Sequence, residues 1–114
     1  MMDSTNLPLD MHVVGELREI MGDDFSLLIE TFVNDSCVRF ADLDKALSNG
    51  DGEAFRRAAH SFKGSAGNLG AKQLTELCRQ LEQMGLENRL GDASPLLQQL
   101  HIHYQQAEQA LRSV

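Results

Sequence analysis

The sequence predicts an all-α protein: an antiparallel, up-down-up-down four-helix bundle with a short additional helix at its N-terminus. Apolar residues recur at steps of three and four along most of the 114 residues, which is the spacing of a helix with one buried side. No alternating run of apolar and polar residues is long enough to indicate a strand. The two prolines, Pro8 and Pro95, stand near expected helix starts, where a missing backbone N–H is tolerated.

The N-terminal half is expected to form a short helix followed by a long one. The short helix spans Asp10 to Met21, and Gly22 then ends it, as a residue just past a helix should. The long amphipathic helix begins at Asp23 and closes with the Ser-Asn-Gly sequence of residues 48–50. Its inward-facing positions are Phe25, Leu28, Ile29, Phe32, Ser36, Phe40, Leu43 and Leu47.

Three further helices complete the expected bundle. Asp51 can cap the first of them, which ends at the Asn-Leu-Gly sequence of residues 68–70. The second ends near Gly85, and the third begins between Asp92 and Pro95. Their inward-facing residues are Phe55, Ala58, Ala59, Phe62 and Ala66, then Leu74, Leu77, Cys78, Leu81 and Met84, then Leu97, Leu100, Tyr104, Ala107 and Leu111. Amphipathic helices joined by short connections bury these sides most economically as an antiparallel bundle.

Length and charge narrow the expected function. A chain of this size predicts one domain over residues 1–114, of which residues 1–8 are expected to be disordered or extended. The net charge of -7 repels nucleic-acid phosphates and anionic lipids, so neither is an expected partner. The chain shows no export signal and no apolar run that could span a bilayer, so we expect a cytoplasmic protein. Because one bundle can use all the apolar sides, we expect a monomer.

Most cysteines and histidines have ordinary structural interpretations. Cys37 and Cys78 fall among apolar helical positions, so both are expected to be buried, reduced thiols. His101 and His103 are two residues apart and point to different sides of a helix, while His12 lies in the short first helix. We interpret these three histidines as surface or rim residues. No metal site is expected, because the spacing supplies too few ligands.

Residues 60–70, HSFKGSAGNLG, place chemically active groups on the outer side of their helix. At about 100° per residue, His60, Lys63, Gly64 and Gly67 fall away from the apolar side. A neutral imidazole has a free ring nitrogen that can act as a nucleophile, and the Lys63 ammonium supplies charge for an anionic group. Each glycine costs about 1 kcal/mol of helix stability relative to alanine. We interpret that cost as the consequence of leaving space around the ring.

This stretch resembles the HxxKGxxxxxG signature of histidine-containing phosphotransfer domains, the Hpt modules of bacterial and eukaryotic phosphorelays. The following LTELCRQLE resembles the helix that pairs with the motif helix in that family. The resemblance implies that His60 takes a phosphoryl group from a receiver-domain aspartate and relays it to another receiver. It also implies that Lys63 stabilises the phosphoryl oxygens, that Gly64 leaves room for them, and that Glu82 orients the imidazole.

The resemblance also implies the partners, which would be receiver domains of hybrid sensor kinases and response regulators. Members of the family do not catalyse the transfer alone, because the receiver supplies the aspartate and the magnesium ion. The chain is therefore expected to need no cofactor of its own and to be a phosphoryl carrier rather than an enzyme.

Basic residues gather near the motif within an otherwise acidic chain; they are Arg56, Arg57, Lys63, Lys72 and Arg79. Their positive field would steer an acidic receiver pocket toward the histidine. The alternative interpretation of these charges is solubility alone. The candidate docking residues are Arg56, Arg57, Ser61 and Arg79.

Other functional classes fit less well. The glycines follow GxxGxxG spacing, with neither the following Lys-Ser/Thr nor the preceding strand of a phosphate-binding loop. Without a nucleotide site the chain cannot be a complete histidine kinase. Ser61 and Ser65 have no Asp or second His nearby in sequence for a hydrolase triad. Two alternatives stay open: a helical adaptor or inhibitor that docks without being phosphorylated, and a phosphatase that acts on the receiver.

Overall fold

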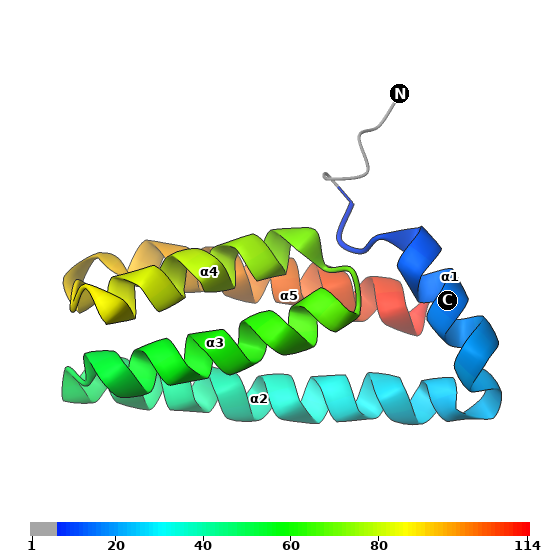
Figure 1. Ribbon diagram of the computed structural model, residues 1–114, viewed down its shortest axis with the longest axis horizontal. Helices are drawn as coiled ribbons and strands as arrows, with labels where there is room; N and C mark the ends of the chain where they lie inside the picture. The colour runs from blue at the N-terminus through cyan, green and yellow to red at the C-terminus, as the bar shows by residue number, and fades with distance from the viewer. Residues whose placement is uncertain (1–6) are drawn as a thin grey trace.

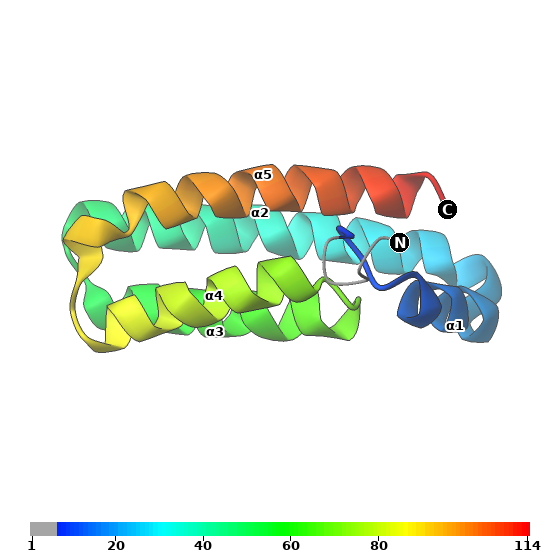
Figure 2. The ribbon, with the colours of Figure 1, turned by 90° about the horizontal axis from the view of Figure 1, so that it is seen from above.

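The computed structural model describes residues 7–114. Its helices are α1 (Met11–Met21), α2 (Phe25–Asn49), α3 (Gly52–Asn68), α4 (Lys72–Leu86) and α5 (Ser94–Arg112), with 3₁₀ turns at Gly22–Asp24 and Leu90–Asp92. No strand occurs within the described residues. Helices α2 to α5 run in alternating directions along the bundle, and α1 lies at the end where α2 begins (Figures 1 and 2). The predicted fold class is confirmed.

The helix ends follow the capping residues that the sequence indicates. The Asp10 carboxylate accepts a hydrogen bond of 3.0 Å from the backbone N–H of His12, and Asp51 accepts one of 3.0 Å from that of Ala54. Such caps each stabilise a helix by about 1 kcal/mol. Gly50 ends α2 in the left-handed conformation, with φ of 64°. The registers of α1 and α3 are therefore fixed locally as well as by the core.

An aromatic cluster in the core fixes the rotation of α3. The ring of Phe62 meets the ring of Phe40 on α2 edge-on, with centroids 5.0 Å apart. Tyr104 on α5 packs against Phe40 in the same way at 5.4 Å. Phe55 and Phe62 on α3 are both fully buried, and burying each such ring contributes about 2–3 kcal/mol. Their burial turns the opposite side of α3, which carries His60, toward solvent.

Helices α3 and α4 make an unusually close contact at Gly85. The sequence predicts that α4 ends near Gly85; the helix ends at Leu86, and Gly85 is buried in its last turn. A Cβ at Gly85 would lie 2.8 Å from the Gly52 carbonyl oxygen and 2.8 Å from the backbone nitrogen of Arg56. This glycine therefore allows two backbones to approach.

The segment before α1 is attached to the connection between α3 and α4. The backbone N–H of Asp10 donates a 2.8 Å hydrogen bond to the carbonyl of Gly70. Gly70 has φ of 69°, and a Cβ there would lie 2.9 Å from the Asp10 Cβ. Residues 7–9 are not helical, yet Leu9 is buried. The rest of the segment predicted to be disordered or extended, residues 1–6, lies outside the described residues.

The two cysteines differ, although both were expected to be buried. Cys78 on α4 is buried, and this burial raises the pKa of its thiol to about 12. Cys37 on α2 is exposed, so its predicted burial is wrong. The core position of that turn belongs to Ser36, which is fully buried and continues the four-residue step from Phe32 to Phe40. Cys37 is one residue further along, so the helical rotation of about 100° turns it outward.

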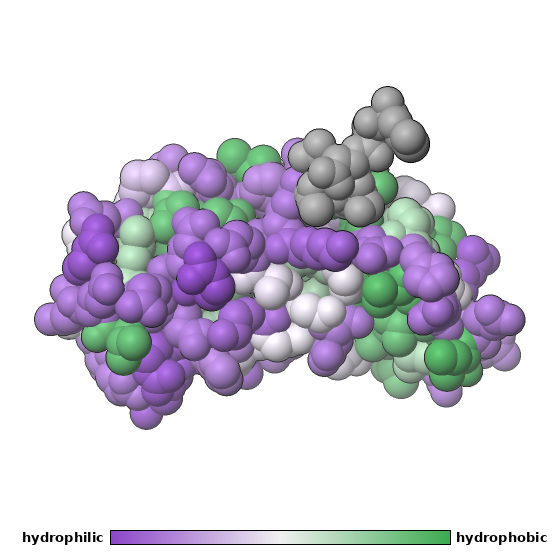
Figure 3. All heavy atoms as spheres, turned by 45° about the horizontal axis from the view of Figure 1, so that its top comes forward, coloured by the Kyte–Doolittle hydropathy of each residue, from purple (hydrophilic) through white to green (hydrophobic). Residues whose placement is uncertain are grey.

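Some large apolar side chains are exposed rather than buried in the bundle. Ile20 on α1 is 81% exposed, and Leu27 in the first turn of α2 is 65% exposed. Figure 3 shows apolar surface at the α1 end of the molecule. Neither Ile20 nor Leu27 belongs to the predicted inward-facing positions, and the monomeric state stays a prediction. No helix of the described chain is long and apolar enough to cross a membrane.

Candidate functional site

His60 stands in the middle of α3 with its side chain in solvent. The side chain is 63% exposed, while the neighbouring residues Ala59 and Phe62 are fully buried. The helical repeat predicted this outward direction, and the structure confirms it. A rigid, core-anchored helix therefore presents an accessible imidazole.

Glu82, on α4, holds one nitrogen of that imidazole. The Nδ1 atom of His60 lies 3.1 Å from Oε1 and 3.3 Å from Oε2 of Glu82. A carboxylate accepts hydrogen bonds, so the neutral ring carries its proton on Nδ1 and donates it to Glu82. The other ring nitrogen, Nε2, then keeps its lone pair. The contact implied for Glu82 by the family resemblance is present in the structure.

Glu82 also binds Lys63. The Nζ atom of Lys63 lies 2.8 Å from Oε2 of Glu82, and the lysine side chain is only 30% exposed. Burial raises the pKa of the Glu82 carboxyl, but hydrogen bonds from Lys63 and His60 outweigh it, so the pKa is lowered. Glu82 is therefore ionised at neutral pH. The sequence predicts Lys63 beside the histidine, but it does not show that this ammonium already has an anionic partner.

The two glycines on the outer side of α3 have different surroundings. A Cβ at Gly64 would meet no described atom within 4 Å outside its own helix backbone and chain neighbours. A Cβ at Gly67 would lie 3.9 Å from the Thr75 Oγ1 on α4, an ordinary contact distance. Open space is thus present at Gly64, one turn after His60, whereas Gly67 faces α4. The access role predicted for both glycines stays a prediction, and the geometry favours Gly64.

Most of the predicted docking cations already have acidic partners. Arg56 forms a 2.6 Å ion pair with Glu53 of its own helix. Arg79 forms a 2.6 Å ion pair with Glu76. Arg57 is exposed and makes no side-chain hydrogen bond or ion pair with any residue in the range 7–114. The positive field expected around the motif is therefore partly neutralised. Arg57 is the predicted docking cation that has no ion-pair partner among the described residues.

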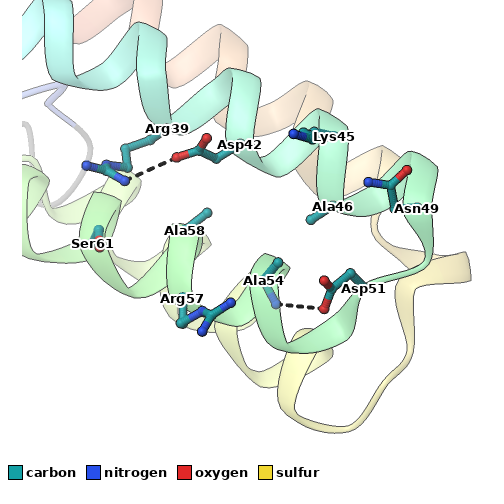
Figure 4. A pocket seen from close by; sticks show the side chains of 10 residues that line it. All are labelled: Arg39, Asp42, Lys45, Ala46, Asn49, Asp51, Ala54, Arg57, Ala58 and Ser61. Atoms are coloured by element: carbon teal, nitrogen blue, oxygen red, sulfur yellow. Dashed lines mark hydrogen bonds and ion pairs between the residues drawn. The ribbon is translucent and has the colours of Figure 1, made fainter.

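A groove lies on the other side of His60, between α2 and α3. It has a volume of about 420 Å³, and Ser61, which directly follows His60, is part of its wall. Figure 4 shows side chains from both helices around it, including Arg57 from α3 and Lys45 from α2. Sequence analysis predicted Ser61 and Arg57 as docking residues but did not detect Lys45, because it is twelve residues away in sequence from Arg57.

The remaining histidines lie away from this site. His12 pairs with Glu16 at 3.0 Å, and His101 stacks on Phe40 with ring centroids 3.9 Å apart. His103 on α5 lines a shallow hollow that also includes Lys72. Within residues 7–114, no group of three or more His, Cys, Asp or Glu side chains is arranged to hold a metal ion.

Comparisons with known proteins show the family to which the chain is similar. The family model of the Hpt domain matches residues 27–110, a range that includes His60 and Glu82. The chain resembles the crystal structure of histidine-containing phosphotransfer protein B from Pseudomonas aeruginosa PAO1, with 36% sequence identity and a TM-score of 0.87. That match covers 92% of this chain and 91% of the other. A comparison with curated proteins found no match.

An all-α bundle that presents an exposed histidine defines a class of protein, the histidine-bearing signalling domains. Within that class, the chain belongs to the Hpt domain family, whose members perform histidine phosphotransfer in two-component phosphorelays. The family that the sequence motif indicates is therefore confirmed. The α1 helix lies outside the matched range, so the family pattern consists of α2 to α5.

Proposed function

We propose that the chain is a cytoplasmic phosphoryl carrier in which Nε2 of His60 takes a phosphoryl group from the aspartyl phosphate of one receiver domain. The same nitrogen passes the group to the aspartate of another receiver. The observation that carries the proposal is the contact between Nδ1 of His60 and Glu82 at 3.1 Å, because it leaves Nε2 unprotonated on a side chain that is 63% exposed.

The chemistry needs no additional base in this chain. The lone pair of Nε2 attacks phosphorus, a P–N bond forms, and the bond between phosphorus and the aspartyl oxygen breaks with release of the carboxylate. The Nδ1 proton stays in place, so the phosphorylated ring is cationic. The Glu82 carboxylate, 3.1 Å away, stabilises that charge. Reversal of the same steps transfers the group to the next receiver.

Lys63 and Gly64 assist in different ways. The Lys63 ammonium lies on the same side of α3 and can turn from Glu82 to the phosphoryl oxygens, which are a stronger anionic partner. Gly64 leaves the space next to the ring open to the donor. We expect the receiver to supply the magnesium ion and the electrophilic phosphate, so this chain contributes a positioned nucleophile and needs no cofactor.

The test uses receiver domains from the same organism, each loaded with acetyl phosphate and Mg²⁺ and then mixed with the chain. We expect at least one receiver to label the wild type with phosphate that is labile in acid. The variant His60→Gln should bind that receiver but stay unlabelled, whereas the control His12→Gln should label normally. Binding by the wild type with no label from any receiver would favour the adaptor, and release of free phosphate would favour a phosphatase.

A further inference from the structure

The groove between α2 and α3 exists because small residues face each other across it. Ala46 on α2 and Ala54 and Ala58 on α3 line its walls. Ala46 and Ala58 are almost completely buried, yet their methyl groups leave a volume of about 420 Å³ above them. Further along the same helix pair, the rings of Phe40 and Phe62 meet and fill the space. These rings separate the groove from a second hollow of about 300 Å³ further along α2 and α3, where Leu17 of α1 also forms part of the wall.

The acidic residues of this groove have hydrogen-bond or ion-pair partners within residues 7–114, whereas two of its basic residues do not. Its two carboxylates are both engaged: Asp42 binds Arg39 at 3.2 Å, and Asp51 caps α3 by accepting from Ala54, as the dashed lines in Figure 4 show. Lys45 and Arg57 have no hydrogen bond or ion pair from their side chains among the described residues. The nearby Glu53 feels the charge of Arg57, but its hydrogen bonds go to Arg56.

Two cations without an ion-pair partner among the described residues lie in one groove of an acidic chain. Its net charge is -7, and other basic side chains near His60 are paired, as Lys63 is with Glu82 at 2.8 Å. An unpaired cation pair in a concave surface attracts anionic groups, and it does so more strongly than an equally charged convex surface. The groove therefore fits carboxylate side chains better than apolar or basic ones.

The groove is continuous with the phosphorylation site. Arg57 precedes His60 by three residues on the same exposed side of α3, which is a distance of about 5 Å along the helix axis. Ser61, directly after His60, forms part of the groove wall. A receiver large enough to bring its aspartate to Nε2 of His60 therefore also covers the groove.

We infer that this groove is a docking site for acidic side chains on the surface of the receiver that exchanges phosphate with His60, with Lys45 and Arg57 as the residues that select it. The inference rests on the proposed function for the identity of the partner. Such charge pairs act mainly on encounter rate and partner choice, while the chemistry at His60 proceeds independently of them.

The experiment measures the dissociation constant of one receiver for four forms of the chain: wild type, Arg57→Glu, the double variant Lys45→Glu with Arg57→Glu, and the control Arg18→Glu. The receiver is the one that labels the wild type fastest or, if none labels it, the one that binds most tightly. Arg18 makes a matched control because it is exposed, lies on α1 outside the groove, and has no side-chain hydrogen bond or ion pair among the described residues. Circular dichroism verifies that each variant is folded.

We expect the double variant to weaken binding at least tenfold at low salt, Arg57→Glu to weaken it about threefold, and the control to change it less than twofold. The difference should shrink as salt is added, because screening weakens charge pairs between exposed groups. A double variant that binds like Arg18→Glu would overturn the inference. Labelling of His60 by phosphoramidate, which needs no receiver, separates this result from a failure of the proposed function, since all four forms should accept that label equally.

Discussion

The two sides of α3 differ in how closely they are packed and in how their charges are used. Toward α4 the backbones touch: a Cβ at Gly85 would lie 2.8 Å from the Gly52 carbonyl, and Lys63 and His60 share Glu82. Toward α2 the same helix faces alanines and a groove of about 420 Å³.

This difference separates two requirements of the proposed phosphoryl carrier. The nucleophile must be held to within about 0.5 Å of its productive geometry, and the close contact of α3 with α4 supplies that by fixing the distance between His60 and Glu82. A partner surface must accept more than one protein, and a groove with unpaired cations allows this without moving the ring. The site is thus rigid on one side of the helix and open on the other.

The largest expected effect comes from filling the open space beside the ring. A leucine at Gly64 would extend back over the preceding turn, where His60 lies, because helical side chains lean toward the N-terminus. We expect Gly64→Leu to slow phosphoryl transfer from the receiver by about a hundredfold, equivalent to about 3 kcal/mol, while the protein stays folded. Rapid-quench kinetics would measure the rate. Transfer at the wild-type rate would show that access at Gly64 is not needed.

An added methyl group should reduce stability more at the close contact between α3 and α4 than at the open position of Gly64. For Gly85→Ala we expect a loss of about 2 kcal/mol in the free energy of unfolding, since the new methyl group meets backbone atoms that cannot move aside easily. Gly64→Ala is the matched control, and it should stabilise the protein by about 0.5–1 kcal/mol because its methyl group meets open space. Urea unfolding measures both. If both variants changed the free energy of unfolding equally, the proposed difference in packing between the two sides of α3 would be wrong.

Removal of the Lys63 charge should affect transfer more than folding. We expect Lys63→Ala to slow transfer about tenfold, which corresponds to about 1.4 kcal/mol, since the phosphoryl oxygens lose a cation. The control Lys72→Ala, on α4 away from the ring, should transfer normally. A wild-type transfer rate in Lys63→Ala would show that Lys63 does not act on the phosphoryl group and that its role is confined to the ion pair with Glu82.

The smallest effect expected is a pH-dependent contribution of Glu82 to stability. Its pKa is lowered from 4.5, so the charged form is favoured in the folded state and stabilises it above pH 4.5, and this stabilisation is lost as the pH falls through the folded pKa. Glu82→Gln should therefore cost about 1 kcal/mol at pH 7 and progressively less below pH 4.5. Urea unfolding of both proteins at several pH values would test this. A constant difference down to the lowest pH would contradict the lowered pKa.

Local patterns in the sequence predicted the helices and the exposed position of His60. The caps at Asp10 and Asp51 and the outward direction of His60 follow from short-range rules of spacing and hydrogen bonding. The end of α4 near Gly85 was predicted, but the contact of Gly85 with α3 was not, because a glycine near a helix end and a glycine at a helix contact look alike in one sequence. Cys37 was misplaced because free cysteine is among the most often buried residue types, whereas the helical step puts Ser36 in the core and Cys37 outside it.

The groove could not be predicted from the sequence for a different reason. It depends on the spacing between α2 and α3, which is set by the tertiary packing of Phe40 against Phe62, and on alanines from both helices. Lys45 and Arg57 become neighbours of one hollow only when the two helices are antiparallel. The pairing of Lys63 with Glu82 is likewise a contact between helices that residue spacing alone does not show.

The most direct test is to locate the phosphoryl group by ¹⁵N NMR of the imidazole nitrogens after the chain has been phosphorylated by its receiver. Because Glu82 holds Nδ1, we expect the group on Nε2 of His60, with the Nδ1 proton still present. A phosphoryl group on Nδ1, or on any residue other than His60, would contradict the proposed arrangement.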